Sequence, residues 1–414
     1  MRLSPYPRYK AGPAKWLGDL PEHWAIERVK YSLSEKGARA APALPAGAIS
    51  FGRVIAKDGE RLPEETRATY QEVLAGEYLI NPINLNYDLI SLRTALSSID
   101  VVVSPAYIVA KPNATKLLPA FGSYLLYVFD IRHMKSLGAG VRQTIAFKDI
   151  GNCYWTLPPT TEQEAITTFL DRETKRIDSL IRKKVRFTEL LKEKREALVF
   201  RAVTKGLDPN APMVVSSLKW LGDRPISWSI RPVKYLVALR SGEAITSDSI
   251  EDGGSFPVYG GNGLRGFTDR YTHEGQYVLV GRQGALCGNV NYAEGRFWAS
   301  EHALVAHPSC DFNTRWLGEL LGVMNLGQHS TAAAQPGISA EVISNLRVPV
   351  PPRDQQDAIA LFISSSTSRI DDLVTNTERS IELLKEHRSA LITSAVTGKI
   401  DVRGLAAKTM KVTA

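Results

Sequence analysis

Two long stretches of the chain carry apolar residues at helical spacing. Four apolar residues of the first stretch share one seven-residue register: Leu170, Ile177, Leu191 and Leu198. Proline and glycine are absent from residues 162–205 and 355–397, which predicts two helices of about 40 residues, each roughly 60 Å long. We expect their apolar stripes to pack together as an antiparallel pair. The alternative is two independent amphipathic helices, each packed on its own domain.

The segments that precede these helices follow a different pattern. Short β-branched runs alternate with glycine and asparagine turns, which is typical of strands. The clearest runs are residues 77–80, 101–103, 106–110, 256–259, 276–280 and 303–306. The fold class predicted is therefore α+β: two mixed α/β domains, related by a pseudo-twofold axis and joined by two long helices that form an antiparallel coiled coil.

An internal repeat supports this organisation. Residues 158–208 align without a gap on residues 351–401, and roughly half of the positions are identical,. Residues 15–31 recur, at a different offset, as residues 219–235. The repeated blocks indicate a shared mechanical role, whereas the segments between them have diverged, as expected for two separate targets.

These blocks divide the chain into five parts. The first domain takes residues 1–157, and the central helical region takes residues 158–208. The second domain takes residues 209–350, and the distal helical region takes residues 351–403. Residues 404–414 form a polar C-terminal tail.

Several repeated motifs resemble those of one known family. Trp-Leu-Gly-Asp occurs at Trp16 and at Trp220, and Pro-Pro-x-x-x-Gln precedes each helix with its Arg-Ile-Asp. Glycine-rich residues 259–263 and 281–288, with Trp-Ala-Ser-Glu-His-Ala at residues 298–303, complete the pattern. In this order, from about residue 6 to 403, the motifs resemble the specificity subunit of bacterial type I restriction-modification systems.

The resemblance implies a function divided among several chains. Each domain is a target-recognition domain that reads one half of a bipartite, asymmetric double-stranded DNA site. The helices set the gap between the half-sites and dock two modification (methyltransferase) subunits, and restriction/translocation subunits complete the complex. That complex is an endonuclease and adenine-N6 methyltransferase. Its S-adenosylmethionine, ATP and Mg²⁺ are implied on the partner subunits, with no cofactor and no catalytic residue on this chain.

Charge and cysteine content agree with that function. The formal net charge is +8, which favours a polyanion such as nucleic acid or an acidic membrane surface. No apolar run approaches the 18 residues of a membrane span, and no signal peptide is apparent,. The three cysteines are far apart and odd in number, as expected in a reducing cytoplasm. We therefore expect a cytoplasmic protein with DNA, and no membrane, as its partner.

Motifs for catalysis are weak. Residues 261–266 match G-x-G-x-x-G, but no apolar helix follows, so a turn between strands is favoured,. Asn81-Pro82-Ile83 resembles only part of an adenine-methyltransferase motif. Asp171, Glu173 and Lys175 imitate a nuclease core inside a helix, where a solvated face is favoured. The histidines form no metal-ligand pair,, and we expect no catalytic or metal site.

We expect arginine, asparagine and glutamine side chains in short turns to contact DNA, because these side chains read base edges. In the second domain we select Asn262, Arg265, Arg282 and Gln283. In the first domain we select Asn84, Asn86, Arg93 and Arg142. The alternative is that the glycine-rich turns only shape the sheet. A rival function of a different class is a coiled-coil scaffold that binds no DNA. The tryptophans of the repeated motif, Trp16, Trp24, Trp220 and Trp228, are expected to pack in a core.

Overall fold

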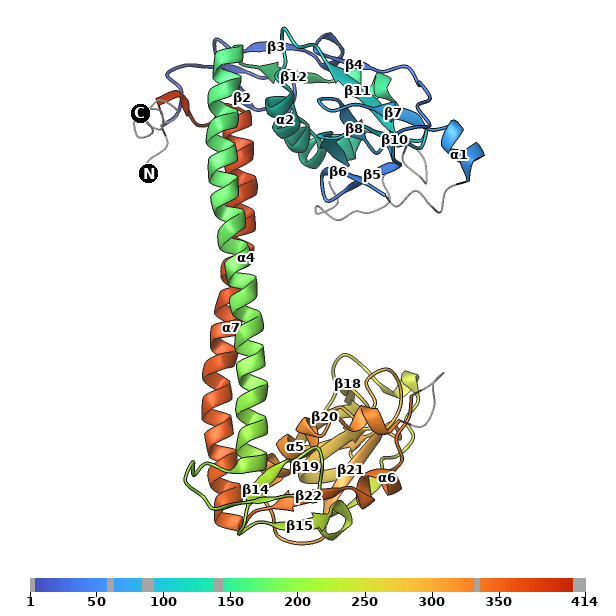
Figure 1. Ribbon diagram of the computed structural model, residues 1–414, viewed down its shortest axis with the longest axis vertical. Coiled ribbons are helices and arrows are strands. Elements are labelled where there is room, and N and C mark those ends of the chain that lie inside the picture. The colour runs from blue at the N-terminus through green and yellow to red at the C-terminus, as the bar shows by residue number, and fades with distance from the viewer. Residues whose placement is uncertain (1–3, 58–62, 84–92, 138–143, 331–335, 405–414) are drawn as a thin grey trace. The chain divides into compact units, whose positions relative to one another are not determined.

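The computed structural model describes residues 4–57, 63–83, 93–137, 144–330 and 336–404. The chain forms two compact units, residues 1–183 with 380–414, and residues 184–379. Each unit contains one mixed domain and about half of each of two long helices (Figure 1). The boundaries of the five predicted parts stay a prediction.

The two long helices match the uninterrupted stretches of the sequence. Helix α4 spans Thr160–Lys205 and helix α7 spans Arg353–Val396. A pair of prolines precedes each helix, where the missing N–H costs nothing,. Beyond the helix ends lie Gly206 and Gly398, with φ of 76° and 69°. This left-handed conformation, which glycine adopts readily, is the usual way to end a helix.

The helices pair antiparallel, and the same arginine–aspartate ion pair joins them once in each unit. In the first unit Arg388 Nε donates to Asp178 Oδ1 at 2.9 Å. In the second unit Arg195 Nε donates to Asp371 Oδ1 at 3.0 Å. The repeat aligns Asp178 with Asp371 and Arg195 with Arg388, so each ion pair is the repeat equivalent of the other. The predicted coiled coil is confirmed.

The seam between the helices is only partly apolar. Leu170, Ile177, Ile363 and Ile370 are buried on the expected register. Threonines are buried beside them, and their hydroxyls bond back to the helix. For example, Thr174 Oγ1 donates to the Leu170 carbonyl at 2.7 Å. This local bond removes the cost of burying a hydroxyl in the seam.

The first domain is built on an antiparallel sheet of order β4-β11-β8-β9. Its strands are β1 Tyr9–Ala11, β2 Asp19–Pro21, β3 Ala25–Arg28, β4 Leu33–Glu35, β5 Gly47–Ser50, β6 Arg53–Ala56, β7 Gln71–Val73, β8 Tyr78–Ile80, β9 Thr94–Leu96, β10 Val101–Val103, β11 Ile108–Pro112 and β12 Tyr154–Leu157. Its helices are α1 Glu64–Ala68, α2 Pro119–Arg132 and α3 Phe147–Gly151. Helix α2 supplies Phe121, Leu125 and Phe129 to the main core.

The second domain has a larger sheet of order β16-β21-β19-β20-β17-β18. Its strands are β13 Met213–Val215, β14 Asp223–Pro225, β15 Ser229–Pro232, β16 Val237–Ser241, β17 Phe256–Gly260, β18 Gly263–Thr268, β19 His273–Gly281, β20 Val290–Ala299, β21 Ala303–Pro308 and β22 Arg347–Val350. Helices α5 Thr314–Val323 and α6 Ala340–Asn345 follow the sheet strands. Trp316, Leu317 and Leu320 of α5 lie in the core.

The two domains share one topology although their sequences differ. The order β4-β11-β8-β9 of the first matches β16-β21-β19-β20 of the second. An isolated bridge joins Ile83 to Thr144 in the first domain, and another joins Gln283 to Gly337 in the second. The offset of 193 residues, carried back from the repeat through β12 and β22 and through α3 and α6, pairs Thr144 with Gly337. Ile83 therefore takes the structural place of Gln283.

Each domain is fastened to the helix that follows it by a tryptophan. Trp24 Nε1 donates to Glu162 Oε1 at 3.1 Å, and Trp228 Nε1 donates to Gln355 Oε1 at 2.7 Å. Glu162 and Gln355 are repeat equivalents in the first helical turns. Trp24 and Trp228 are buried, Trp16 is also buried, and Trp220 packs against the second core. The prediction that these tryptophans serve packing is confirmed.

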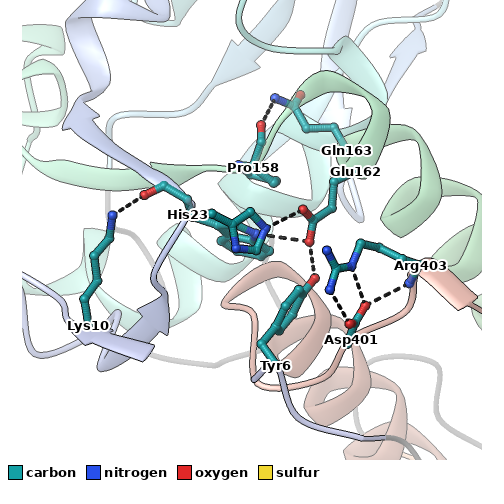
Figure 2. Close-up of polar contacts among 9 residues, drawn as sticks. Tyr6, Lys10, His23, Pro158, Glu162, Gln163, Asp401 and Arg403 are labelled. Carbon is teal, nitrogen blue, oxygen red and sulfur yellow. Dashed lines mark hydrogen bonds and ion pairs between the residues drawn. The ribbon is translucent and has the colours of Figure 1, made fainter. Parts of the chain in front are cut away.

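The residue that accepts the tryptophan hydrogen bond is a glutamate in the first domain, Glu162, and a glutamine in the second, Gln355. Glu162 also accepts from the Tyr6 hydroxyl and lies 2.9 Å from His23 Nε2. Beside Tyr6, Arg403 is paired with Asp401 at 2.6 Å (Figure 2). Burial and the bond to Glu162 raise the pKa of Tyr6 well above its ordinary value, so this hydroxyl stays a donor.

Candidate nucleic-acid interface

A groove in the second domain collects three of the four residues selected there. Its volume is about 420 Å³, and its lining is Gly261, Asn262, Arg265, Gln283, Gly284, Ala285, Leu286 and His302. Asn262 lies in the β17–β18 turn and Arg265 lies on β18. Gln283 lies in the loop after β19, and His302 lies in the turn between β20 and β21. Three separate turns therefore meet at one surface.

Glycine makes this meeting possible. A Cβ placed on Gly281 would lie 2.1 Å from the carbonyl oxygen of Gly261, a distance that no side chain tolerates. The end of β19 and the β17–β18 turn therefore touch backbone to backbone. The close contact of these glycines shapes the sheet and also brings Asn262 and Gln283 to the same groove. A role in the turn and a role in presenting DNA-reading side chains are therefore compatible.

Neighbouring polar groups orient the amides of the groove. Asn289 Nδ2 donates to Asn262 Oδ1 at 3.1 Å, and Gln283 Oε1 lies 3.1 Å from His302 Nδ1. The other ring nitrogen of His302, Nε2, lies 3.2 Å from Glu301 Oε1. Both amide contacts use the amide oxygens, and the exposed side chains of Asn262 and Gln283 keep their amide nitrogens as donors,.

Arg282 is held differently from its neighbours. Its guanidinium donates from Nη1 to Ser241 Oγ at 2.9 Å, at the end of β16. Its backbone N–H donates to the His302 carbonyl at 2.8 Å, and its carbonyl accepts from Ile338 at 2.9 Å. Arg282 therefore positions the loop that carries Gln283, and a DNA contact by its side chain stays a prediction.

The position of Arg93 corrects an expectation about the first domain. The residue is only 5% exposed. Its Nε donates to Asp130 Oδ1 at 3.0 Å, and its backbone N–H donates to Asp130 Oδ2 at 2.9 Å. This buried ion pair joins the start of β9 to α2. A guanidinium enclosed in this way serves the fold and is not presented to DNA.

The other selections in the first domain, Asn84, Asn86 and Arg142, lie outside the described residues. Asn84 and Asn86 stay predictions.

Sequence reasoning missed His302, Asn289 and Leu286 at the groove. His302 lies within the motif at residues 298–303, but it forms no metal-ligand pair with another histidine that would mark it in the sequence. Leu286 is an exposed leucine on the groove wall. No local pattern distinguishes such a side chain from an ordinary loop residue.

The weak catalytic motifs have structural explanations. Residues 261–266 belong to the β17–β18 hairpin, as expected of a turn between strands. Asn81 Oδ1 accepts from the Ile83 N–H at 3.0 Å, which closes a turn after β8. Asp171 lies within α4 and accepts from the Tyr124 hydroxyl at 2.7 Å. Among the described residues no three His, Cys, Asp or Glu side chains gather in a way that suits a metal ion, and no helix has the length and apolarity to span a membrane.

Comparisons with known proteins match the second domain most directly. Residues 225–383 fit the model of the type I restriction modification DNA specificity domain. The EcoprrI specificity subunit of Escherichia coli is 34% identical over 34% of this chain and 35% of its own length. A putative type I specificity subunit of Mycoplasma pneumoniae is 26% identical over 55% of this chain and 89% of its own. The matches to the first three curated relatives span between 32% and 38% of their lengths.

Solved structures show the same fold over nearly the whole chain. A chain from a study of type I restriction-modification complex assembly and conformational transition has a TM-score of 0.73, with 15% identity, over 94% of this chain and 100% of its own. The HsdS subunit of Thermoanaerobacter tengcongensis has a TM-score of 0.54, with 16% identity, over the same shares. The comparisons thus identify residues 225–383 as a type I restriction modification DNA specificity domain. Over nearly its whole length the chain shares the fold of the solved HsdS subunit.

Proposed function

We propose that this chain reads a bipartite, asymmetric double-stranded DNA site, one domain for each half-site, for a type I restriction-modification complex. The groove of the second domain carries the proposal, because it gathers Asn262, Arg265 and Gln283 inside the matched residues 225–383. An arginine pairs with the acceptors of guanine, and asparagine or glutamine pairs with adenine. Leu286 adds an apolar contact of the kind that fits a thymine methyl group,.

The charge of the chain supports a DNA partner over the scaffold alternative. Its formal surplus of +8 suits phosphate contact,. A scaffold that binds no DNA has no use for arginine and amide side chains grouped in an exposed groove. DNA affinity that falls steeply with rising salt is the expected property of this chain.

The helices supply the surface for partner subunits in this proposal. Exposed leucines occupy equivalent positions of the repeat, Leu180 with Leu373 and Leu190 with Leu383. An apolar surface that occurs twice in one chain suits two copies of one partner. We assign it to two modification (methyltransferase) subunits, with restriction/translocation subunits completing the complex. S-adenosylmethionine, ATP and Mg²⁺ then belong to those partners, as do adenine-N6 methylation and cleavage.

Methylation mapping tests the proposal. Bacterial cells that express this chain with its modification subunit should acquire a new bipartite methylated motif with a fixed gap, which cells without the chain lack. The double variant Asn262→Ala with Arg265→Ala should alter or abolish one half-site only. Replacing residues 1–157 with another subunit's first domain should change the other half-site. The proposal fails if the partner is soluble and bound to this chain but no new methylation appears.

A further inference from the structure

The β5–β6 hairpin of the first domain ends in an aromatic residue that no other part of the fold explains. Ser50 pairs with Arg53, which leaves Phe51 and Gly52 as the two residues of the turn. Their φ angles are 46° and 70°, the positive values of a type I′ turn. The side chain of Phe51 is 84% exposed.

Phenylalanine is unfavourable at the first central position of this turn. Both central positions of a type I′ turn prefer asparagine, aspartate or glycine, because a Cβ is strained at positive φ. The exposed ring of Phe51 also gives up the burial that normally makes an aromatic stabilising. Local strain of this kind is typical of residues held for contact with a ligand.

The topology places this hairpin where the second domain carries its groove. Strand β17 pairs parallel with β20 through Val258 and Trp298, just before the β17–β18 turn. In the first domain β9 and β10 together precede β11 as the long β20 precedes β21, so β10 corresponds to the end of β20. A parallel bridge joins Ala46 to Val102 of β10, just before the β5–β6 hairpin. Phe51 therefore stands at the turn that corresponds to the one carrying Asn262.

The surroundings of the ring suit DNA. Arg53 and Lys57 follow Phe51 on the same hairpin arm, and both are exposed. Cations beside an exposed ring can contact phosphates while the ring enters the stacked bases. We propose that Phe51 inserts its ring against the bases of the half-site read by the first domain, with Arg53 and Lys57 on the backbone. This inference rests on the proposed DNA-reading function and names the residue that performs it in the first domain.

A variant that improves the turn separates this role from a structural one. Phe51→Asn suits positive φ, so the thermal unfolding midpoint of the full chain should rise or stay unchanged. Base–aromatic contact of the usual strength predicts that affinity for a duplex with the methylated motif falls about 5- to 150-fold. Tyr31→Asn is the matched control, because Tyr31 is an exposed aromatic elsewhere in the same domain, and it should leave affinity unchanged. Unchanged affinity of Phe51→Asn overturns the inference.

Cross-linking distinguishes this inference from the proposed function itself. A benzophenone amino acid is placed at Phe51, at Leu286 of the groove or at Tyr31, and the full complex is irradiated with genomic DNA fragments. Cross-links to DNA from residues 51 and 286, but not 31, support both ideas. A DNA cross-link from 286 alone overturns the role of Phe51 and leaves the proposed function standing. A cross-link from residue 51 to a partner protein also overturns the role of Phe51. If neither residue 51 nor residue 286 cross-links to DNA, that result counts against both the role of Phe51 and the proposed function.

Discussion

The glutamine of the repeated Pro-Pro-x-x-x-Gln motif fastens each domain to its helix, and its loss should loosen the first domain more than the second. Gln163 is fully buried. Its Oε1 accepts from the Leu118 N–H at 2.9 Å, and its Nε2 donates to the carbonyls of Lys116 and Pro158 at 2.7 and 2.9 Å. The side chain thus satisfies three backbone groups between β11 and α2 and at the start of α4.

Gln163→Leu removes all three bonds at nearly constant volume and helix propensity. Each buried backbone group left without a partner costs about 1–3 kcal/mol, and the added apolar burial offsets part of this. We expect a loss of about 3 kcal/mol. The equivalent Gln356 makes only two such bonds, to the Pro351 carbonyl at 3.0 Å and from the Asn313 N–H at 2.9 Å. Gln356→Leu should therefore cost about 2 kcal/mol.

Hydrogen exchange of the full chain measures this directly, because the Leu118 amide is itself one of the lost bonds. In Gln163→Leu the amides of residues 116–118 and 120 should exchange roughly 100-fold faster, following the free energy of local opening. Glu164→Leu, at the next and exposed position of the same turn, is the control and should change exchange little. If Gln163→Leu accelerates exchange no more than Glu164→Leu does, the fastening role assigned to Gln163 is refuted.

Three further predictions concern the seam, the groove and pH. Arg195→Asp should destabilise the second unit by about 1 kcal/mol, because its pair with Asp371 is partly exposed,; adding Asp371→Arg should restore most of the loss in urea unfolding, and no restoration would contradict the pairing. Gly281→Ala should abolish methylation directed by the second domain, since its Cβ would meet the Gly261 carbonyl oxygen at 2.1 Å; Gly284→Ala, whose Cβ meets open space and whose cost is the strain of its φ of 91°, should act more weakly in the same methylation assay. Burial lowers the pKa of His273 below its ordinary value of 6.5, aided by His307, whose own pKa burial and Arg240 also lower. The unfolded chain therefore binds these protons first, so stability is full above about pH 6.5 and falls as the pH drops below it. Thermal unfolding from pH 8 to 5 should show this, and a chain equally stable throughout would contradict it.

Local and repeated patterns in the sequence determined much of this protein. Helices α4 and α7 follow from uninterrupted stretches with apolar residues at heptad spacing, a signal that nearby residues carry. Their pairing follows from the repeat, because two equivalent stripes of equal length can cover each other. The resemblance to type I specificity subunits follows from the order of the repeated motifs, and the burial of Trp24 and Trp228 follows from the preference of tryptophan for cores,.

Tertiary structure alone decided which side chains face one another. Asn262 and Gln283 are far apart in sequence, and they share a groove because Gly261 and Gly281 let two backbones touch. Arg93 looks like any loop arginine until the fold places Asp130 against it and buries both. Phe51 becomes informative only when its positive φ and exposure are known. Composition and periodicity record which elements form, whereas contacts between distant turns depend on sheet order and register, and these depend on packing over the whole domain.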